Sequence, residues 1–118
     1  MANILIVDDA KFMRATLATI LKKDHHIVGE AVSGREAVIM YEKYKPELVL
    51  MDITMPELSG IDALKEIKKS DPSAKVIMCS ALGQQKVVME SIEAGAKDFI
   101  VKPFEASRVL DAINRILR

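Results

Sequence analysis

Five short apolar runs, separated by amphipathic segments, constrain the fold of this chain more than any other feature. The runs cover residues 4–7, 27–32, 48–51, 76–79 and 99–101. Short apolar runs of this kind are typical of parallel strands that are buried on both faces of a sheet. The intervening segments carry apolar residues at helical spacing, for example Met13, Leu17 and Leu21. The pattern predicts an α/β fold, a parallel sheet of five strands with helices on both faces.

Local signals mark where several helices begin and end. Ser33 and Glu36 have the spacing of a capping box, which opens a helix, and Pro46 stops the same helix. The segment around Pro72 ends the following helix. No linker or internal repeat divides the 118 residues, so we expect residues 1–118 to form a single domain.

Composition excludes several classes of protein. The hydrophobic fraction is 50% and the charged fraction 29%, which excludes intrinsic disorder. The 17 Lys and Arg residues balance the 17 Asp and Glu residues, which argues against nucleic acid as a partner and against an anionic membrane surface. No apolar run is long enough for membrane insertion, and no signal peptide opens the chain. Cys79 is the only cysteine, so we expect a protein of the reducing cytoplasm.

Polar side chains follow four of the five predicted strands. Asp8 and Asp9 follow the first strand, Asp52 the third, Ser80 the fourth and Lys102 the fifth. The carboxyl ends of parallel strands meet at one edge of the sheet, where ligands of open α/β sheets bind. The sequence therefore predicts that carboxylates, a hydroxyl and an ammonium group converge there.

Three carboxylates in one place repel each other, so a cation is expected among them. Hard carboxylate oxygens suit Mg²⁺, which in turn suits a phosphoryl ligand. The ammonium of Lys102 can pair with a phosphoryl oxygen and the hydroxyl of Ser80 can donate to another. A carboxylate such as that of Asp52 can also act as the nucleophile and form an aspartyl phosphate. We therefore hypothesise a Mg²⁺-assisted phosphoryl site.

Each residue also has a simpler interpretation. A single Asp after a strand is most often a turn former or a helix cap, and Asp9 has the position to cap the first helix. The adjacent His25 and His26 are expected in a surface loop. Cys79 is expected to be a small buried hydrophobe.

The motifs around these residues resemble those of the response regulator receiver domain, over nearly the whole chain. They are Val7-Asp8-Asp9, Met51-Asp52-Ile53-Thr54-Met55-Pro56, Gly60, Ser80-Ala81, Gly95-Ala96-Lys97-Asp98 and Lys102-Pro103-Phe104. The resemblance implies the strand order 2-1-3-4-5 of the flavodoxin-like receiver fold. Within the family, residues 10–14 and 80–85 are most similar to the stand-alone chemotaxis regulators.

The resemblance assigns roles at the predicted site. Asp52 is the phosphoacceptor for a histidine kinase. Mg²⁺ is bound by Asp9, Asp52 and the backbone carbonyl of Thr54, with Asp8 acting mostly through water. Lys102 pairs with the phosphoryl group, and its bond to the following proline is expected to be cis.

The resemblance also implies a switch. Ser80 moves toward the phosphoryl group and Phe99 turns inward behind it, which changes the surface of the fourth helix, fifth strand and fifth helix. In a chemotaxis regulator this surface binds a flagellar motor switch protein. Thr54 and Leu82 stand where the enteric regulators carry Asn and Glu, so the lifetime of the phosphorylated state and the type of phosphatase stay open. The aromatic residue of the switch is Phe and not Tyr.

The expected protein is a monomeric signalling module of a two-component system, which catalyses only its own phosphotransfer and dephosphorylation. Two alternatives in the family are a phosphorelay intermediate, which docks through Lys11, Phe12, Arg14 and Ala15 of the first helix, and a receiver domain cut from a longer regulator. Two alternatives from outside the family fit the residues less well. A phosphatase of the haloacid dehalogenase type needs a second acid two residues after its nucleophile, where this chain has Thr54. A flavodoxin-like FMN carrier needs a hydroxyl-rich loop where Asp8 and Asp9 stand.

Overall fold

Strands and helices alternate along the whole chain in a computed structural model that describes residues 2–81 and 83–118. The elements are β1 (Asn3–Val7), α1 (Lys11–Leu21), β2 (His26–Ala31), α2 (Gly34–Tyr44), β3 (Leu48–Asp52), α3 (Gly60–Ser70), β4 (Val76–Ser80), α4 (Gln85–Glu93), β5 (Asp98–Val101) and α5 (Ala106–Leu117). The α/β prediction is confirmed, and every predicted strand end lies within one residue of the observed end.

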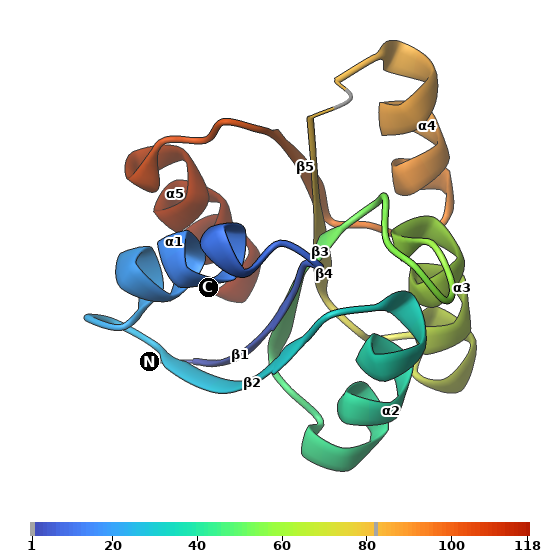
Figure 1. The fold of residues 1–118 in the computed structure, drawn as a ribbon, viewed down its shortest axis with the longest axis horizontal. Coiled ribbons are helices and arrows are strands. Elements are labelled where there is room, and N and C mark those ends of the chain that lie inside the picture. Colours follow the sequence, from blue (N-terminus) through green and yellow to red (C-terminus); the bar gives the residue numbers. More distant parts are fainter. Residues whose placement is uncertain (1, 82) are drawn as a thin grey trace.

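The five strands form one parallel sheet in the order β2-β1-β3-β4-β5, which confirms the predicted topology. Helices α1 and α5 cover one face, and α2, α3 and α4 cover the other (Figure 1). In the sheet β2 lies on one side of β1 and β3 lies on the other, so the direction in which strands are added reverses at β1. In open parallel sheets ligands bind beyond the carboxyl ends of the strands at such a reversal, which here are the ends of β1 and β3.

Side chains of the central strands alternate between two hydrophobic cores, one on each face of the sheet. The core under α2, α3 and α4 takes Leu5, Val7, Val49, Met51, Val76 and Met78. The core under α1 and α5 takes Ile4, Ile6, Leu48, Leu50, Ile77 and Cys79. Because both faces are buried, these strands need apolar residues at every position, which explains the continuous runs in the sequence.

The capping box of α2 is present and reaches one residue further than the simplest form. The backbone N–H of Glu36 donates to Ser33 Oγ at 3.1 Å, and Glu36 Oε1 accepts from the backbone N–H of Val32 at 3.0 Å. Asp9 does not cap α1, because the N-cap position is occupied by Ala10. Instead the carboxylate of the preceding Asp8 accepts the backbone N–H of Ala10 at 2.9 Å.

Hydrogen bonds close the amino-terminal edge of the sheet. The hydroxyl of Tyr41 donates to Asp71 Oδ2 at 2.6 Å. The prediction that His25 lies in a surface loop is wrong, because this imidazole is only 9% exposed and its Nδ1 accepts the backbone N–H of Ala2. The turn from α1 into β2 brings His25 under the start of the chain. His26 is exposed, as expected.

None of the helices within residues 2–81 and 83–118 combines the length and apolarity that a membrane span needs.

Candidate functional site

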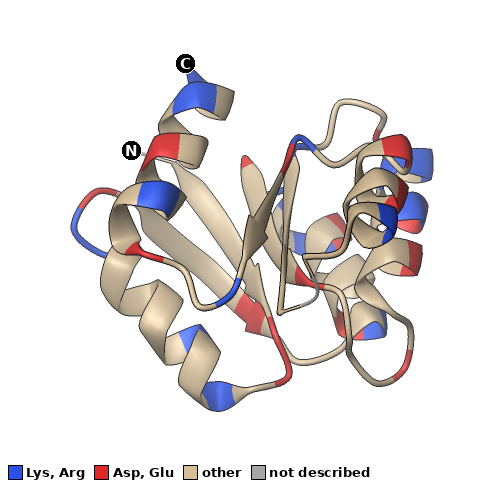
Figure 2. Ribbon diagram, turned by 90° about the horizontal axis from the view of Figure 1, so that it is seen from above, with Lys and Arg blue, Asp and Glu red and all other residues tan. Residues whose placement is uncertain are grey.

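Three carboxylates meet at the carboxyl edge of the sheet. Asp8 and Asp9 follow β1, and Asp52 ends β3, the strand next to β1. One oxygen from each of the three carboxylates lies within 4.8 Å of the others. Asp8 and Asp52 are 2% and 8% exposed, whereas Asp9 faces solvent. In Figure 2 acidic and basic segments come close together at this edge.

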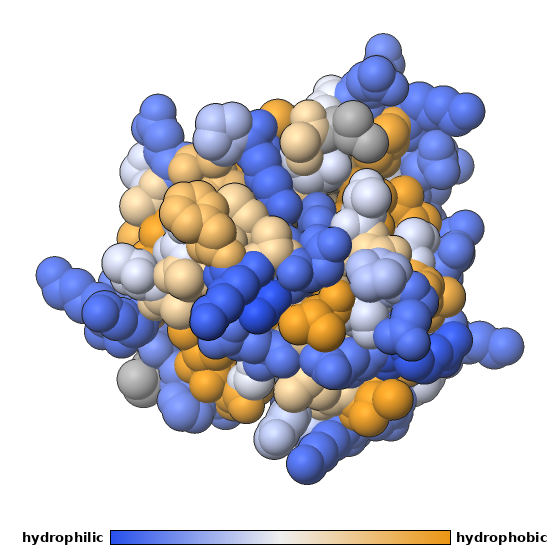
Figure 3. Space-filling view, in the orientation of Figure 1, coloured by the Kyte–Doolittle hydropathy of each residue, from blue (hydrophilic) through white to orange (hydrophobic). Residues whose placement is uncertain are grey.

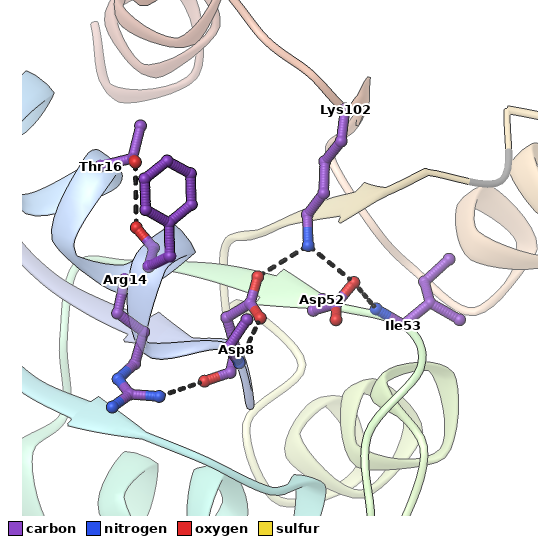
Figure 4. A network of polar contacts seen from close by, with 8 residues as sticks. Asp8, Arg14, Thr16, Asp52, Ile53 and Lys102 are labelled. Atoms are coloured by element: carbon purple, nitrogen blue, oxygen red, sulfur yellow. Dashed lines mark hydrogen bonds and ion pairs between the residues drawn. The ribbon is translucent and has the colours of Figure 1, made fainter.

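The side chain of Lys102 reaches from the end of β5 between two of these carboxylates (Figure 4). Its Nζ donates to Asp8 Oδ2 at 2.7 Å and lies 3.3 Å from Asp52 Oδ1. The lysine side chain is only 15% exposed, so the ion pairs lie in a partly dehydrated environment. One ammonium group faces three carboxylates, which leaves a formal surplus of two negative charges when all are ionised.

Burial and neighbouring charges shift the protonation of this cluster. Burial raises the pKa of Asp52, the charge of Lys102 acts against this shift, and the charge of Asp8 adds to it. Burial lowers the pKa of Lys102, but its hydrogen bond to Asp8 and the charge of Asp52 outweigh that effect and leave the pKa raised. The ammonium form of Lys102 is therefore favoured, whereas burial makes the anion of Asp52 less favourable than that of an exposed carboxyl group.

Backbone groups and one arginine hold the carboxylates in place. The N–H of Ile53 donates to Asp52 Oδ1 at 2.9 Å. Arg14 Nη1 donates to the backbone carbonyl of Asp8 at 2.9 Å, and Arg14 Nε pairs with Glu30 at 3.0 Å. The phosphorelay alternative placed Arg14 near the site, on the docking face of α1; its side chain is 15% exposed and ties α1 to the end of β1 and to β2. Only its nearness to Asp8-Asp9 along the chain hinted at this contact.

Ser80 and Phe99 lie on the neighbouring strands β4 and β5. Ser80 ends β4, is 2% exposed, and its carbonyl accepts the backbone N–H of Lys102 at 2.9 Å. Phe99 is 8% exposed and belongs to the core on the side of α2, α3 and α4. The Lys102–Pro103 peptide bond is cis, as predicted from the resemblance.

Thr54 stands two residues beyond β3 in the loop that leads to α3, and its side chain is exposed. Leu82, the other departure from the enteric pattern, lies outside the described residues. The donor set suits Mg²⁺, because carboxylate and carbonyl oxygens are its preferred protein ligands. The structure thus gathers Asp8, Asp9, Asp52 and Lys102 at one edge, with Thr54 in the loop beside it and Ser80 at the end of the next strand.

The fold and this acidic edge define a class of protein, and sequence comparison agrees. Residues 4–114 match the family model of the response regulator receiver domain, and the chain belongs to that family. Within it the chain is similar to proteins named Chemotaxis protein CheY. The CheY of Thermotoga maritima is 60% identical over 97% of this chain and 96% of its own length. The CheY of Bacillus subtilis is also 60% identical, over 98% of this chain and 97% of its own length.

A solved structure supports the same assignment. A chain in the crystal structure of the CheX–CheY–BeF3–Mg²⁺ complex from Borrelia burgdorferi superposes with a TM-score of 0.95. It is 39% identical, and the match covers 98% of this chain and 89% of that chain. The likeness therefore extends over the entire receiver fold, including the edge that carries the carboxylates.

Proposed function

We propose that this protein is a phosphorylation-switched signalling module in which Asp52 accepts a phosphoryl group from a histidine kinase. One observation supports this most strongly: Lys102 Nζ lies between the buried carboxylates of Asp8 and Asp52, at 2.7 and 3.3 Å. In the transfer, a carboxylate oxygen of Asp52 forms a bond to phosphorus, and the bond from phosphorus to the nitrogen of the kinase histidine breaks. The protein acts on itself and not on a released substrate.

The carboxylates of Asp9 and Asp52 and the backbone carbonyl of Thr54 would hold Mg²⁺, with Asp8 acting through water. The bound ion supplies positive charge beside the transferred group. Asp8 also keeps Lys102 oriented through its 2.7 Å hydrogen bond. Because Lys102 already lies 3.3 Å from Asp52 Oδ1, a small movement places its ammonium group on a phosphoryl oxygen.

The phosphorylated state is read through Ser80 and Phe99. Ser80 ends β4 one strand away from Asp52, and Phe99 lies on β5 opposite Met78. A movement of the Ser80 hydroxyl toward the phosphoryl group changes the space behind it, and the aromatic ring of Phe99 responds. The surface of α4, β5 and α5 then shifts to a form that binds a flagellar motor switch protein of the FliM type. Exposed Met89 and Val101 supply apolar contacts on that surface.

The proposed partners follow from this function and from the relatives. A CheA-like histidine kinase supplies the phosphoryl group, and the proposed site of action is the cytoplasm. The structure of a CheX–CheY complex from Borrelia burgdorferi makes a CheX-like protein the first partner to test for ending the signal. Between these encounters we expect a monomer. The face drawn in Figure 3 mixes hydrophilic and hydrophobic residues.

The test of the acceptor is phosphorylation by acetyl phosphate in the presence of Mg²⁺, followed by intact-protein mass spectrometry. Wild-type protein should gain a labile adduct of about 80 Da, and chelation of Mg²⁺ should prevent it. Asp52→Asn should gain none, because the amide is a poor nucleophile. The matched control is Asp71→Asn, which changes a carboxylate at the opposite edge and should be phosphorylated normally. An undiminished adduct on Asp52→Asn would sink the assignment.

A second function, phosphorelay, is favoured by one observation: Phe12 on α1 is 76% exposed next to the acidic edge. A histidine phosphotransfer protein could dock there. The two functions differ in the response to beryllofluoride, which mimics the phosphoryl group when Asp and Mg²⁺ hold it. Chemotaxis predicts tighter binding of the N-terminal peptide of a flagellar motor switch protein with beryllofluoride, and Ser80→Ala should weaken that response. Unchanged peptide binding, with beryllofluoride shown to be bound, favours the phosphorelay or a receiver from a longer regulator.

A further inference from the structure

The loop between β3 and α3 packs against the first turn of α2. Gly34, the first residue of that helix, is buried, and a Cβ atom placed on it would lie 2.0 Å from the backbone carbonyl oxygen of Leu58. Carbon and oxygen atoms that are not bonded to each other cannot approach so closely. The absence of a side chain at Gly34 therefore permits this contact between the helix and the loop.

A hydrogen bond holds the same contact. The backbone N–H of Arg35 donates to the carbonyl of Glu57 at 2.9 Å. The first N–H groups of a helix lack partners inside the helix, so α2 has a donor to spare for the loop. Glu57 and Leu58 have φ angles of 52° and 103°, which non-glycine residues adopt only when the surroundings hold them there.

The other end of the loop is anchored at α3. The N–H of Gly60 donates to the carbonyl of Ile53 at 2.7 Å, and a Cβ on Gly60 would lie 1.9 Å from the carbonyl oxygen of Asp52. Thr54 lies between the two anchors, two residues beyond the end of β3. The course of the backbone at Thr54 is therefore set from both ends.

The start of α2 is fixed by contacts that do not involve this loop. Ser33 Oγ accepts the N–H of Glu36, and Glu36 Oε1 accepts the N–H of Val32. These capping contacts within α2 therefore fix the positions of Gly34 and of the Arg35 N–H. The loop must adapt to the helix, rather than the helix to the loop.

We propose that the first turn of α2 is a clamp that positions the Thr54 carbonyl for Mg²⁺, with Gly34 as a positioning residue for the metal. The inference rests on the proposed function, in which that carbonyl is a Mg²⁺ ligand. A displaced loop would turn the carbonyl away from the carboxylates of Asp9 and Asp52. By linkage, Mg²⁺ bound to the loop must strengthen the contact between the loop and α2 to the same degree.

The first test is Gly34→Ala, with the Mg²⁺ dissociation constant measured by calorimetry without any phosphodonor. Alanine is the better helix former, so a helix with no clamp would tolerate the change. The clamp predicts a dissociation constant raised about tenfold, as when the support of a metal ligand is lost. The control is Gly29→Ala, whose Cβ would meet side-chain atoms and no backbone: Met40 Cε at 3.1 Å, Tyr44 Cε2 at 3.5 Å and Leu5 Cδ1 at 3.6 Å. It should bind Mg²⁺ as the wild type does.

The second test uses wild-type protein and does not depend on the folding of a variant. Hydrogen exchange of the Arg35 amide is followed by NMR with and without saturating Mg²⁺. The clamp predicts that Mg²⁺ slows exchange at Arg35 more than at Ala37, whose amide donates to Ser33 in the same turn and does not touch the loop. Equal slowing at the two amides overturns the clamp, whether or not Gly34→Ala folds.

The outcomes separate the clamp from the function on which it rests. Absence of Mg²⁺ binding by wild-type protein, or binding unaffected by Asp9→Asn, overturns the proposed metal site and the clamp with it. Normal wild-type binding that is weakened by Asp9→Asn but unchanged in folded Gly34→Ala overturns the clamp alone. Weaker binding in Gly34→Ala, together with selective slowing at Arg35, supports it.

Discussion

The two edges of the sheet differ in how their polar and charged groups are paired. At the amino-terminal edge, polar groups meet partners of complementary chemistry: the Tyr41 hydroxyl donates to Asp71, and the backbone N–H of Asn3 donates to Glu47. At the carboxyl edge, three carboxylates have oxygens within 4.8 Å of one another, and a single ammonium group pairs with two of them. The pairs at the amino-terminal edge stabilise the fold, whereas the carboxyl edge keeps an excess of negative charge that attracts a cation.

The pKa values of Asp71 and Asp52, one carboxyl group from each edge, are shifted in opposite directions. Hydrogen bonds from Tyr41 and then Ser73 lower the pKa of Asp71, so its anion is more favourable in the folded protein than in the unfolded chain. Burial raises the pKa of Asp52, with Asp8 adding to the shift, so its anion is less favourable in the folded protein. The ionised carboxylate of Asp52 therefore costs stability, and a bound cation can offset that cost.

The largest expected effect on this comparison comes from Asp9→Asn. The variant removes one charge from the carboxyl edge, and the Mg²⁺ dissociation constant should rise about tenfold or more, because Mg²⁺ depends on carboxylate ligands. Calorimetric titration with Mg²⁺ measures it. Asp24→Asn, which changes an exposed acid in the turn before β2, is the control. Equal weakening in both variants would show that overall charge, and not the acidic edge, attracts the ion.

A smaller effect is expected at the other edge from Tyr41→Phe. The free energy of unfolding should fall by about 1 kcal/mol, because the variant lacks the hydroxyl that donates the 2.6 Å hydrogen bond to Asp71. Urea denaturation at neutral pH measures it. Tyr44→Phe on the same helix is the control, since that side chain is 40% exposed, and it should change little. The Mg²⁺ affinity of Tyr41→Phe should equal that of the wild type; a change there would break the separation of the two edges.

The smallest expected effect is the pH dependence of the Tyr41→Phe variant. The pKa of Asp71 is lowered in the fold, so its anion contributes stability above the ordinary value of 3.8 and loses that contribution as the pH falls through the folded pKa. The difference in unfolding free energy between wild type and Tyr41→Phe should thus be constant at neutral and mildly acidic pH, and should shrink below about pH 4. A difference that grows on acidification would contradict the sign of this linkage.

Much of the fold could be predicted because the signals are local. Continuous apolar runs indicate strands buried on both faces, and the five runs lie within one residue of the observed strands at each end. The capping residues Ser33 and Glu36 placed the start of α2 correctly. The convergence of Asp8, Asp52 and Lys102 followed from a general property of parallel sheets, whose carboxyl ends share one edge.

The remaining contacts depend on tertiary packing between segments that are distant in sequence. Arg14 was expected near the site, but the sequence did not predict that its guanidinium group binds the Asp8 carbonyl, a contact that forms because α1 lies close to β2 and Glu30. His25 was expected at the surface and is buried under Ala2. The approach of Gly34 to Leu58 joins the first turn of α2 to a loop more than 20 residues away in sequence, and no local pattern marks it.

The buried anion of Asp52 costs the folded protein stability, and the same anion serves the proposed site for Mg²⁺ and a phosphoryl group. The direct test is urea denaturation of wild type and Asp52→Asn at neutral pH, each with and without saturating Mg²⁺. Without Mg²⁺ the variant should be the more stable protein, because it removes a buried anion next to Asp8. With Mg²⁺ the wild type should gain more stability than the variant. A metal-free variant less stable than wild type, or equal gains from Mg²⁺ in both proteins, would contradict the account.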